Sequence, residues 1–209
     1  MKIIIFGATG MVGKELVKQG LYNSHEVKAY GRNVFTEGLP EDKKLELIQG
    51  ALFDESHVYK AIQGCDAVLS SLGGALDGSD KTRSLGMKNI VKQMEKAGVK
   101  RIVAIGGPGV LNAGENKLIM DEEDFPGQFL AVSQEHLKAL EFLKASGLQW
   151  TFVCPPMITE AEPTGIFNTA ADWPPTPNHS KISSGDLALF MLNEMVQNEY
   201  VRHRVGISN

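Results

Sequence analysis

The segment from Ile3 to Gly13 reads IIIFGATGMVG and decides the fold of this chain. Its first four residues are apolar and mostly β-branched, which is typical of a strand buried on both faces. Gly7, Gly10 and Gly13 follow the strand, and a segment with helical periodicity runs from about residue 12 to residue 19. A strand, a glycine-rich turn and a helix in this order predict a βα unit whose turn can hold a phosphate group.

The three glycines have different steric roles in such a unit. The first permits the tight turn, the second lets the backbone approach a pyrophosphate, and the third lets the helix pack closely on the strand. The N-terminus of the helix adds unpaired N–H groups and the positive end of its dipole. A P-loop does not fit, because five residues separate Gly7 from Gly13 and Glu15 stands where that motif needs a hydroxyl. We therefore expect a dinucleotide at this turn.

The remainder of the chain alternates short apolar runs with longer segments of helical periodicity. This alternation is typical of parallel strands joined by crossover helices. We expect further strands at 26–30, 45–49, 67–72, 101–105 and 149–154, and helices at 55–63, 82–97 and 130–145. Because the strands show almost no polar alternation, helices should cover both faces of the sheet. The prediction is a single α/β domain of the Rossmann type over residues 1–209, with a doubly wound, mostly parallel sheet and central strand order 3-2-1-4-5-6.

Composition limits the partners and the location of the protein. The 209 residues are 43% hydrophobic and 22% charged, as in a globular protein, and the net charge of -4 comes without a long basic run, so nucleic acid is not an expected partner. No stretch reaches the roughly 20 apolar residues of a membrane span, and the apolar opening run ends at Gly7, too early for a signal peptide. Cys65 and Cys154 show no Cys-x-x-Cys spacing and suit a reducing compartment. We expect a cytoplasmic protein with no membrane partner, and the oligomeric state stays open.

Two segments interrupt the alternation, and both follow expected strand ends. Residues 106–129 contain several glycines and the acidic run from Asp121 to Asp124, and residues 155–180 contain six of the nine prolines. Open α/β sheets bind ligands at strand ends, so we expect both segments to form walls of a substrate pocket. The acidic run is interpreted as a solvated loop. Met157, Phe167 and Trp173 could pack in the core, form a lid or contact the substrate.

The end of the second strand bears on the choice between NAD and NADP. NAD-binding proteins usually carry an acidic residue there, which holds the ribose hydroxyls. This chain has Tyr30-Gly31-Arg32-Asn33 instead. A carboxylate would repel a 2′-phosphate, whereas Arg32 could bind it through charge-assisted hydrogen bonds. We therefore expect NADP(H) as the cofactor, with NAD(H) as the alternative.

With these features, the chain resembles the atypical short-chain dehydrogenases, and among them the biliverdin-IXβ reductase/flavin reductase type. The likeness runs over the whole chain and agrees in length and in the order of the motifs. The residues that carry it are Phe6-Gly7-Ala8-Thr9-Gly10, Leu72-Gly73, Asn89-Ile90-Val91, Val132 to Leu137, Ser146-Gly147-Leu148, Val153 to Pro156, Pro163-Thr164-Gly165 and Asp186 to Leu192, the last in a C-terminal helix.

The resemblance also implies which residues would contact each part of the cofactor and the substrate. Gly7, Thr9, Gly10, Met11, Val12 and Gly13 would hold the pyrophosphate, Arg32 the 2′-phosphate, Ala51 and Leu52 the adenine, and Leu72, Gly73 and Gly74 the path to the nicotinamide. Gly106, Gly107, His136, Pro155 and Pro156 would surround the nicotinamide and the substrate. Many relatives have Asp in place of Ala51, so one hydrogen bond to the adenine is expected to be missing.

Two departures from the better-known short-chain dehydrogenases affect the chemistry. Their Tyr-x-x-x-Lys pair is absent, because no tyrosine here has a lysine four residues on, and Ser133 and Leu137 stand at the family position of the pair. Reductase-type relatives usually keep a Ser or Thr after the fifth strand, where this chain has Gly107. Alcohol–ketone chemistry by the tyrosine mechanism is therefore not expected.

Hydride transfer to a conjugated acceptor remains, because it needs placement in a dry pocket more than it needs acid–base groups. A proton can come from water or from His136, since histidine ordinarily titrates near neutrality. Proton donation, positioning of cofactor or substrate, and a structural role are all open for His136. The resemblance implies an NADPH-dependent reductase of a flavin, quinone or other conjugated small acceptor. The alternatives are a non-catalytic NAD(P)-binding redox sensor of the NmrA-like type and an epimerase or dehydratase of nucleotide sugars.

Other chemistries lack their motifs. The chain has no Gly-x-Ser-x-Gly elbow for a hydrolase, and no His-Glu-x-x-His or Cys-x-x-Cys for a metal site. Cys154 at a strand end is interpreted as a buried, unreactive thiol. We therefore expect no metal.

Overall fold

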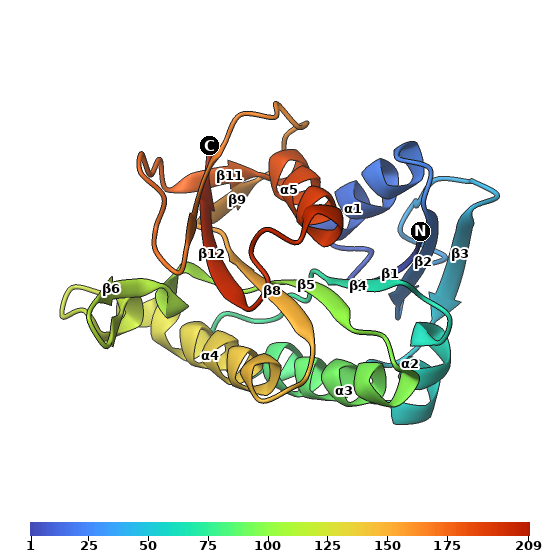
Figure 1. Ribbon diagram of the computed structural model, residues 1–209, viewed down its shortest axis with the longest axis horizontal. Coiled ribbons are helices and arrows are strands. Elements are labelled where there is room, and N and C mark those ends of the chain that lie inside the picture. Colours follow the sequence, from blue (N-terminus) through green and yellow to red (C-terminus); the bar gives the residue numbers. More distant parts are fainter.

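Eight strands form one sheet in the order β10-β12-β8-β5-β4-β1-β2-β3 in the computed structural model, which describes residues 1–209 (Figure 1). Only β10 runs antiparallel to its neighbour. The strands are β1 (Lys2–Phe6), β2 (Glu26–Gly31), β3 (Leu45–Gln49), β4 (Ala67–Ser70), β5 (Arg101–Ile105), β8 (Gln149–Cys154), β10 (Asn168–Ala171) and β12 (His203–Ser208). The order of the six central strands, β3 to β8, is the predicted one.

Five helices cover the two faces of this sheet, which confirms the predicted doubly wound Rossmann-type architecture (Figure 1). On one face lie α1 (Met11–Tyr22) and α5 (Ser184–Gln197), and on the other α2 (Glu55–Ile62), α3 (Thr82–Ala97) and α4 (Leu130–Lys144). Alternate residues of β1 therefore enter different cores: Ile3 and Ile5 pack on the α1 side, and Ile4 and Phe6 on the α3 side. Burial on both faces explains the unbroken apolar run that opens the chain. No helix is both long and apolar enough to span a membrane.

The sequence did not predict the outer strands β10 and β12 or the short strands in the two irregular segments. Residues 106–129 contain the hairpin of β6 (Asn112–Gly114) and β7 (Lys117–Leu118), with 3-10 turns around it. Residues 155–180 contain β9 (Met157–Thr159) and β10, and β9 pairs with β11 (Lys181–Ser183). Both segments are thus fixed to the body of the protein, and their role as pocket walls stays a prediction.

A buried ion pair anchors α5 across the amino-terminal ends of β5 and β8. The Arg101 guanidinium donates to the Glu194 carboxylate at 2.8 Å, and Thr151 Oγ1 donates to the same oxygen at 2.8 Å. The backbone N–H groups of Glu199 and Tyr200 also donate to Glu194, at 3.1 and 3.0 Å. The carboxylate is therefore fully hydrogen-bonded, as a buried charge must be. This anchor lies at the edge of the sheet opposite the glycine turn.

Candidate functional site

The glycine turn between β1 and α1 has no room for side chains at its two ends. Gly7 has a φ of +81°, and a Cβ placed on it would lie 2.6 Å from the carbonyl oxygen of Ser71. A Cβ on Gly13 would lie only 2.0 Å from the carbonyl oxygen of Gly7. The Gly10 N–H donates to that same oxygen at 3.1 Å and closes the turn. The first turn of α1 therefore lies directly against the end of β1.

The N-terminus of α1 is built to receive an anion. Gly10 caps the helix without a side-chain hydrogen bond, and no acidic residue lies in the first turn. The first N–H with an intrahelical partner is that of Lys14, which donates to the Gly10 carbonyl at 2.9 Å, so the N–H groups of Met11, Val12 and Gly13 are free. Free N–H groups at the positive end of a helix dipole suit a phosphate. The residues present thus fit the pyrophosphate of a dinucleotide.

The structure brings the predicted cofactor residues to one edge of the sheet. Each group follows the carboxyl end of a parallel strand, and these ends meet at the same edge, where open α/β sheets bind ligands. The groups are Gly7 to Gly13 after β1, Arg32 after β2, Ala51 and Leu52 after β3, Leu72 to Gly74 after β4, Gly106 and Gly107 after β5, and Pro155 and Pro156 after β8. Their individual roles stay predictions.

Arg32 is available to a ligand at this edge. Its side chain is exposed and makes no hydrogen bond or ion pair with the rest of the chain. Its backbone carbonyl accepts a hydrogen bond from Gln49 Nε2 at 2.8 Å, which ties the turn after β2 to the end of β3. The guanidinium is therefore free on a fixed backbone.

Two buried side chains to which the sequence analysis gave no role in the site hold the backbone at the expected adenine position. Tyr30 Oη donates to the carbonyl of Ala51 at 2.9 Å, and Asn89 Nδ2 donates to the carbonyl of Leu52 at 2.8 Å. Burial raises the pKa of Tyr30 to about 12, so its hydroxyl remains a donor. A tyrosine at a strand end and an asparagine inside an apolar helix face were the only signals in the sequence.

At the expected nicotinamide position, the imidazole of His136 faces Gly107. A Cβ on Gly107 would lie 2.8 Å from His136 Cδ2 and 3.1 Å from Nε2. The ring therefore occupies the space that a hydroxyl-bearing residue would need there. Burial, helped by the positive charge of Arg83, lowers the pKa of His136 to about 3, so the ring is neutral at ordinary pH. Its Nδ1 is buried and has no hydrogen-bond partner.

A cluster of charged residues links the loop after β4 to α3, and α3 to α4. The Arg83 guanidinium donates to the carbonyls of Gly74 and Ala75, at 2.9 and 2.8 Å. Glu135, almost completely buried on α4, accepts hydrogen bonds from Ser84, Lys81 and Lys138. Burial alone would raise the pKa of Glu135, but these three donors lower it to about 2. The carboxylate therefore stays charged and links the starts of α3 and α4.

Asp186, at the start of α5, holds the loop that carries Pro163-Thr164-Gly165. Its carboxylate accepts hydrogen bonds from the backbone N–H groups of Thr164 and Gly165, both at 2.7 Å, and from Ser183 Oγ at 2.8 Å. Burial opposes the charge, yet these donors keep the pKa of Asp186 below its usual value. The Pro163-Thr164-Gly165 motif thus has a structural role, because its contact with Asp186 fixes one predicted pocket wall to the body of the protein.

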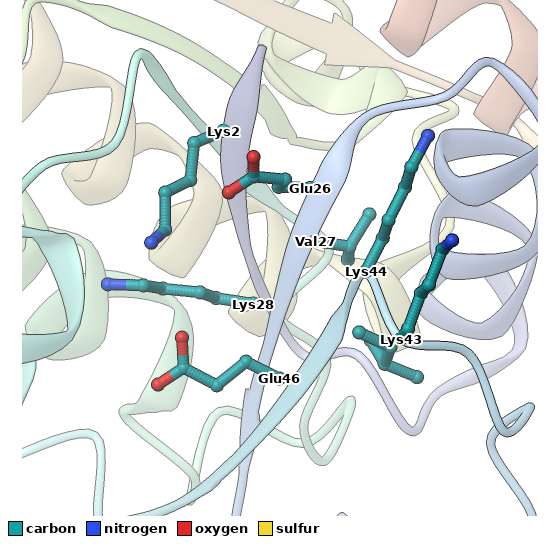
Figure 2. A pocket seen from close by; sticks show the side chains of 8 residues that line it. Lys2, Glu26, Val27, Lys28, Lys43, Lys44 and Glu46 are labelled. Atoms are coloured by element: carbon teal, nitrogen blue, oxygen red, sulfur yellow. The ribbon is translucent and has the colours of Figure 1, made fainter.

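A separate hollow of about 350 Å³ lies at the opposite edge of the sheet (Figure 2). It is lined by the amino ends of β1, β2 and β3 and by Lys43 and Lys44. Lys28, which points across it in Figure 2, donates to the carbonyls of Ala61 and Gln63 at 2.8 and 3.3 Å and so caps the end of α2. The buried lysine is therefore explained by the fold, and this hollow is not part of the predicted site.

A parallel sheet, a glycine turn and an open helix N-terminus at one edge define an NAD(P)-binding Rossmann protein. Residues 7–198 match the family described as NAD(P)H-binding, and the chain belongs to this family. The uncharacterized protein YwnB of Bacillus subtilis (strain 168) is 27% identical over 216 residues, which covers 99% of this chain and 98% of YwnB.

Two solved structures are similar over their whole length. A candidate exported protein from Burkholderia pseudomallei has a TM-score of 0.86 and 31% identity, with 100% of both chains covered. SP1627 from Streptococcus pneumoniae TIGR4, described as a candidate NADH-flavin reductase, has a TM-score of 0.85 and 25% identity, with 99% of this chain and 98% of that chain covered. The fold is therefore that of an NAD(P)-binding Rossmann domain.

We expect the substitution Gly13→Ala to weaken NADPH binding about tenfold or more, since each lost hydrogen bond to a phosphate is worth ~1.5–3 kcal/mol. The new methyl group would force α1 away from the Gly7 carbonyl and misplace the free N–H groups. Titration of nicotinamide fluorescence measures the affinity, and circular dichroism checks that the variant is folded. Gly147→Ala is the matched control, because nothing lies within 4 Å of a Cβ there. Unchanged affinity in Gly13→Ala would contradict this account of the turn.

The low pKa of His136 should appear in the dependence of stability on pH. Between about pH 6.5, where an unfolded histidine titrates, and about 3, the unfolded chain binds a proton that folded His136 does not. Stability is therefore lost as the pH falls through this window. As the pH is lowered through this window, the free energy of unfolding of His136→Gln should decrease less steeply than that of the wild type. The difference in slope should be up to about 1.4 kcal/mol per pH unit. Urea unfolding at several pH values measures it, and equal slopes would mean that His136 is charged in the folded protein.

Proposed function

We propose that this protein is an NADPH-dependent reductase that transfers a hydride to a flavin, a quinone or another conjugated small acceptor. The observation that carries the proposal is the combination of an open anion-binding helix N-terminus at Gly10 with an unpaired Arg32 at the end of β2. SP1627, described as a candidate NADH-flavin reductase, adds support through a likeness that spans the chain.

The roles of the side chains follow from their surroundings. The N–H groups of Met11 to Gly13 would bind the pyrophosphate, and Arg32 would bind the 2′-phosphate with two parallel hydrogen bonds. When bound, the reduced nicotinamide supplies the hydride. His136, neutral and pressed against Gly107, would fix the position of the ring or the acceptor rather than act as a charged acid. The proton for the reduced acceptor would then come from water.

The test is oxidation of NADPH by the purified protein with riboflavin, FMN and a quinone as separate acceptors, followed at the nicotinamide absorbance. Reaction with NADH and a binding titration for each cofactor are measured in parallel. We expect turnover with at least one acceptor and a preference for NADPH. Tight NADPH binding without turnover on any acceptor would overturn the reductase and favour the redox sensor. The neutral His136 and the missing hydroxyl at Gly107 are the observations on which that second candidate rests.

Arg32→Ala should weaken NADPH binding about tenfold to a hundredfold, the effect of losing a hydrogen-bonded charge pair. NADH binding should change little, because NADH lacks the 2′-phosphate. Arg32→Lys keeps the charge but not the planar fork of the guanidinium, so its affinity for NADPH should lie between those of the wild type and Arg32→Ala. Both affinities are measured by fluorescence titration, and an equal loss for NADH and NADPH would refute the role of Arg32.

A further inference from the structure

The two segments that flank the expected acceptor position are strongly acidic. Residues 106–129 contain five carboxylates and one lysine, and residues 155–180 contain three carboxylates and neither lysine nor arginine. Together they carry a net charge of -7, whereas the whole chain carries -4. The remainder of the protein is therefore positive by three charges, and the negative charge is concentrated in the two segments that follow β5 and β8.

Only some of these carboxylates are paired. Glu122 lies 3.1 Å from Lys117, Glu162 lies 2.8 Å from Lys18, and Asp172 lies 3.1 Å from Arg204. The others are exposed and have no cation within ion-pair distance: Glu115, Asp121, Glu123, Asp124 and Glu160. An unpaired charge at the surface acts over the Debye length, which is about 8 Å at physiological salt and about 30 Å at 0.01 M.

The same two segments expose large apolar side chains. Phe129, Met157, Ile166 and Trp173 are 40%, 66%, 77% and 45% exposed. Phe167 differs, because it is partly buried and packs against the core, with 5.9 Å between its ring centroid and that of Phe190. Apolar and aromatic surface of this kind suits a flat conjugated ring.

Several basic residues near these segments, Lys81 and Lys117 included, are already paired within the protein. Arg204 donates to Asp172 and to the carbonyl of Val110, and Arg83 donates to backbone carbonyls of the loop after β4. His136 is nine-tenths buried, faces Gly107 and has an Nδ1 without a partner. Its pKa is lowered to about 3 by burial, so it offers no positive charge to an acceptor.

Resting on the reductase function above, we propose that the acceptor is a planar conjugated ring without negative charge, and that anionic forms of the same ring are selected against. The flat ring contacts the exposed apolar side chains, while the unpaired carboxylates repel phosphate, sulfonate or carboxylate groups. For a neutral flavin the reaction balances as one hydride from NADPH and one proton from water, which yield the dihydroflavin, NADP⁺ and hydroxide.

Riboflavin and FMN test the proposal, because they share one isoalloxazine ring and differ by a phosphate. With NADPH saturating, kcat/KM is measured for each at about 0.01 M salt, where screening is weak, and at about 1 M, where the Debye length is about 3 Å. We expect riboflavin to be favoured about threefold or more at low salt, within the range of electrostatic effects on association, and the ratio to fall at high salt.

Charge removal provides the matched comparison. The double variant Glu123→Gln, Asp124→Asn removes two unpaired charges from the acidic run and should raise kcat/KM for FMN about twofold at low salt, with little change for riboflavin. Glu41→Gln, Glu46→Gln removes the same charge from the β2–β3 side, where both residues are exposed, and should leave the riboflavin-to-FMN ratio unchanged.

Failure of this proposal is distinguishable from failure of the reductase. If FMN is reduced as well as or better than riboflavin at low salt, the charge selection is refuted and the reductase stands. If neither is reduced, the proposed function loses its support. The charge selection is then tested separately, by measuring the binding of riboflavin and FMN to the NADP⁺-loaded protein through quenching of flavin fluorescence. Tighter binding of riboflavin than of FMN would then support it, and tighter binding of FMN would overturn it.

Discussion

The contact between Gly13 and the carbonyl oxygen of Gly7 is the constraint on which the site depends. With no Cβ at Gly13, the first turn of α1 lies against the end of β1, where any side chain would come within 2.0 Å of that oxygen. This approach aims the free N–H groups of α1 at the edge where all the parallel strands end. Because the strands are parallel, the turns that follow their carboxyl ends all lie at this same edge.

At the expected nicotinamide end of the site, two glycines also allow a close approach, but here the neighbouring groups are side-chain rings. A Cβ on Gly106 would lie 2.2 Å from the Phe152 ring, and one on Gly107 would lie 2.8 Å from the His136 ring. The two rings fill the space beside the two glycines, so neither position could carry a hydroxyl or a charged acid. A reaction that needs a side-chain proton at a defined position is poorly served by such a wall. A hydride transfer whose proton comes from water is not limited by it.

The parts of the fold that were predicted from sequence are those set by local pattern. The strand–glycine turn–helix unit and the six central strands follow from apolar runs and helical periodicity. β10 was missed because its sequence, Asn-Thr-Ala-Ala, is small and polar, and its place comes from pairing with β12, more than thirty residues away.

The supports of the site were missed for a related reason. Glu135 binds Lys81 across 54 residues and Tyr30 binds Ala51 across 21, so no local pattern records either contact. The position of His136 beside the expected nicotinamide could be inferred by resemblance, but its neutrality could not, since the low pKa arises from burial.

The range over which charges act reconciles an anionic cofactor with acidic walls. Free N–H groups at a helix N-terminus attract a phosphate strongly within the first turn, and the attraction falls off quickly beyond it. Unpaired carboxylates such as Glu123 and Asp124 act over the whole Debye length. In the proposed reductase, contacts of the NADPH phosphates with α1 and Arg32 would offset the repulsion by these carboxylates, whereas an acceptor's phosphate would meet it with no matching donor, since the guanidinium groups of Arg83 and Arg204 are already bound to the protein itself.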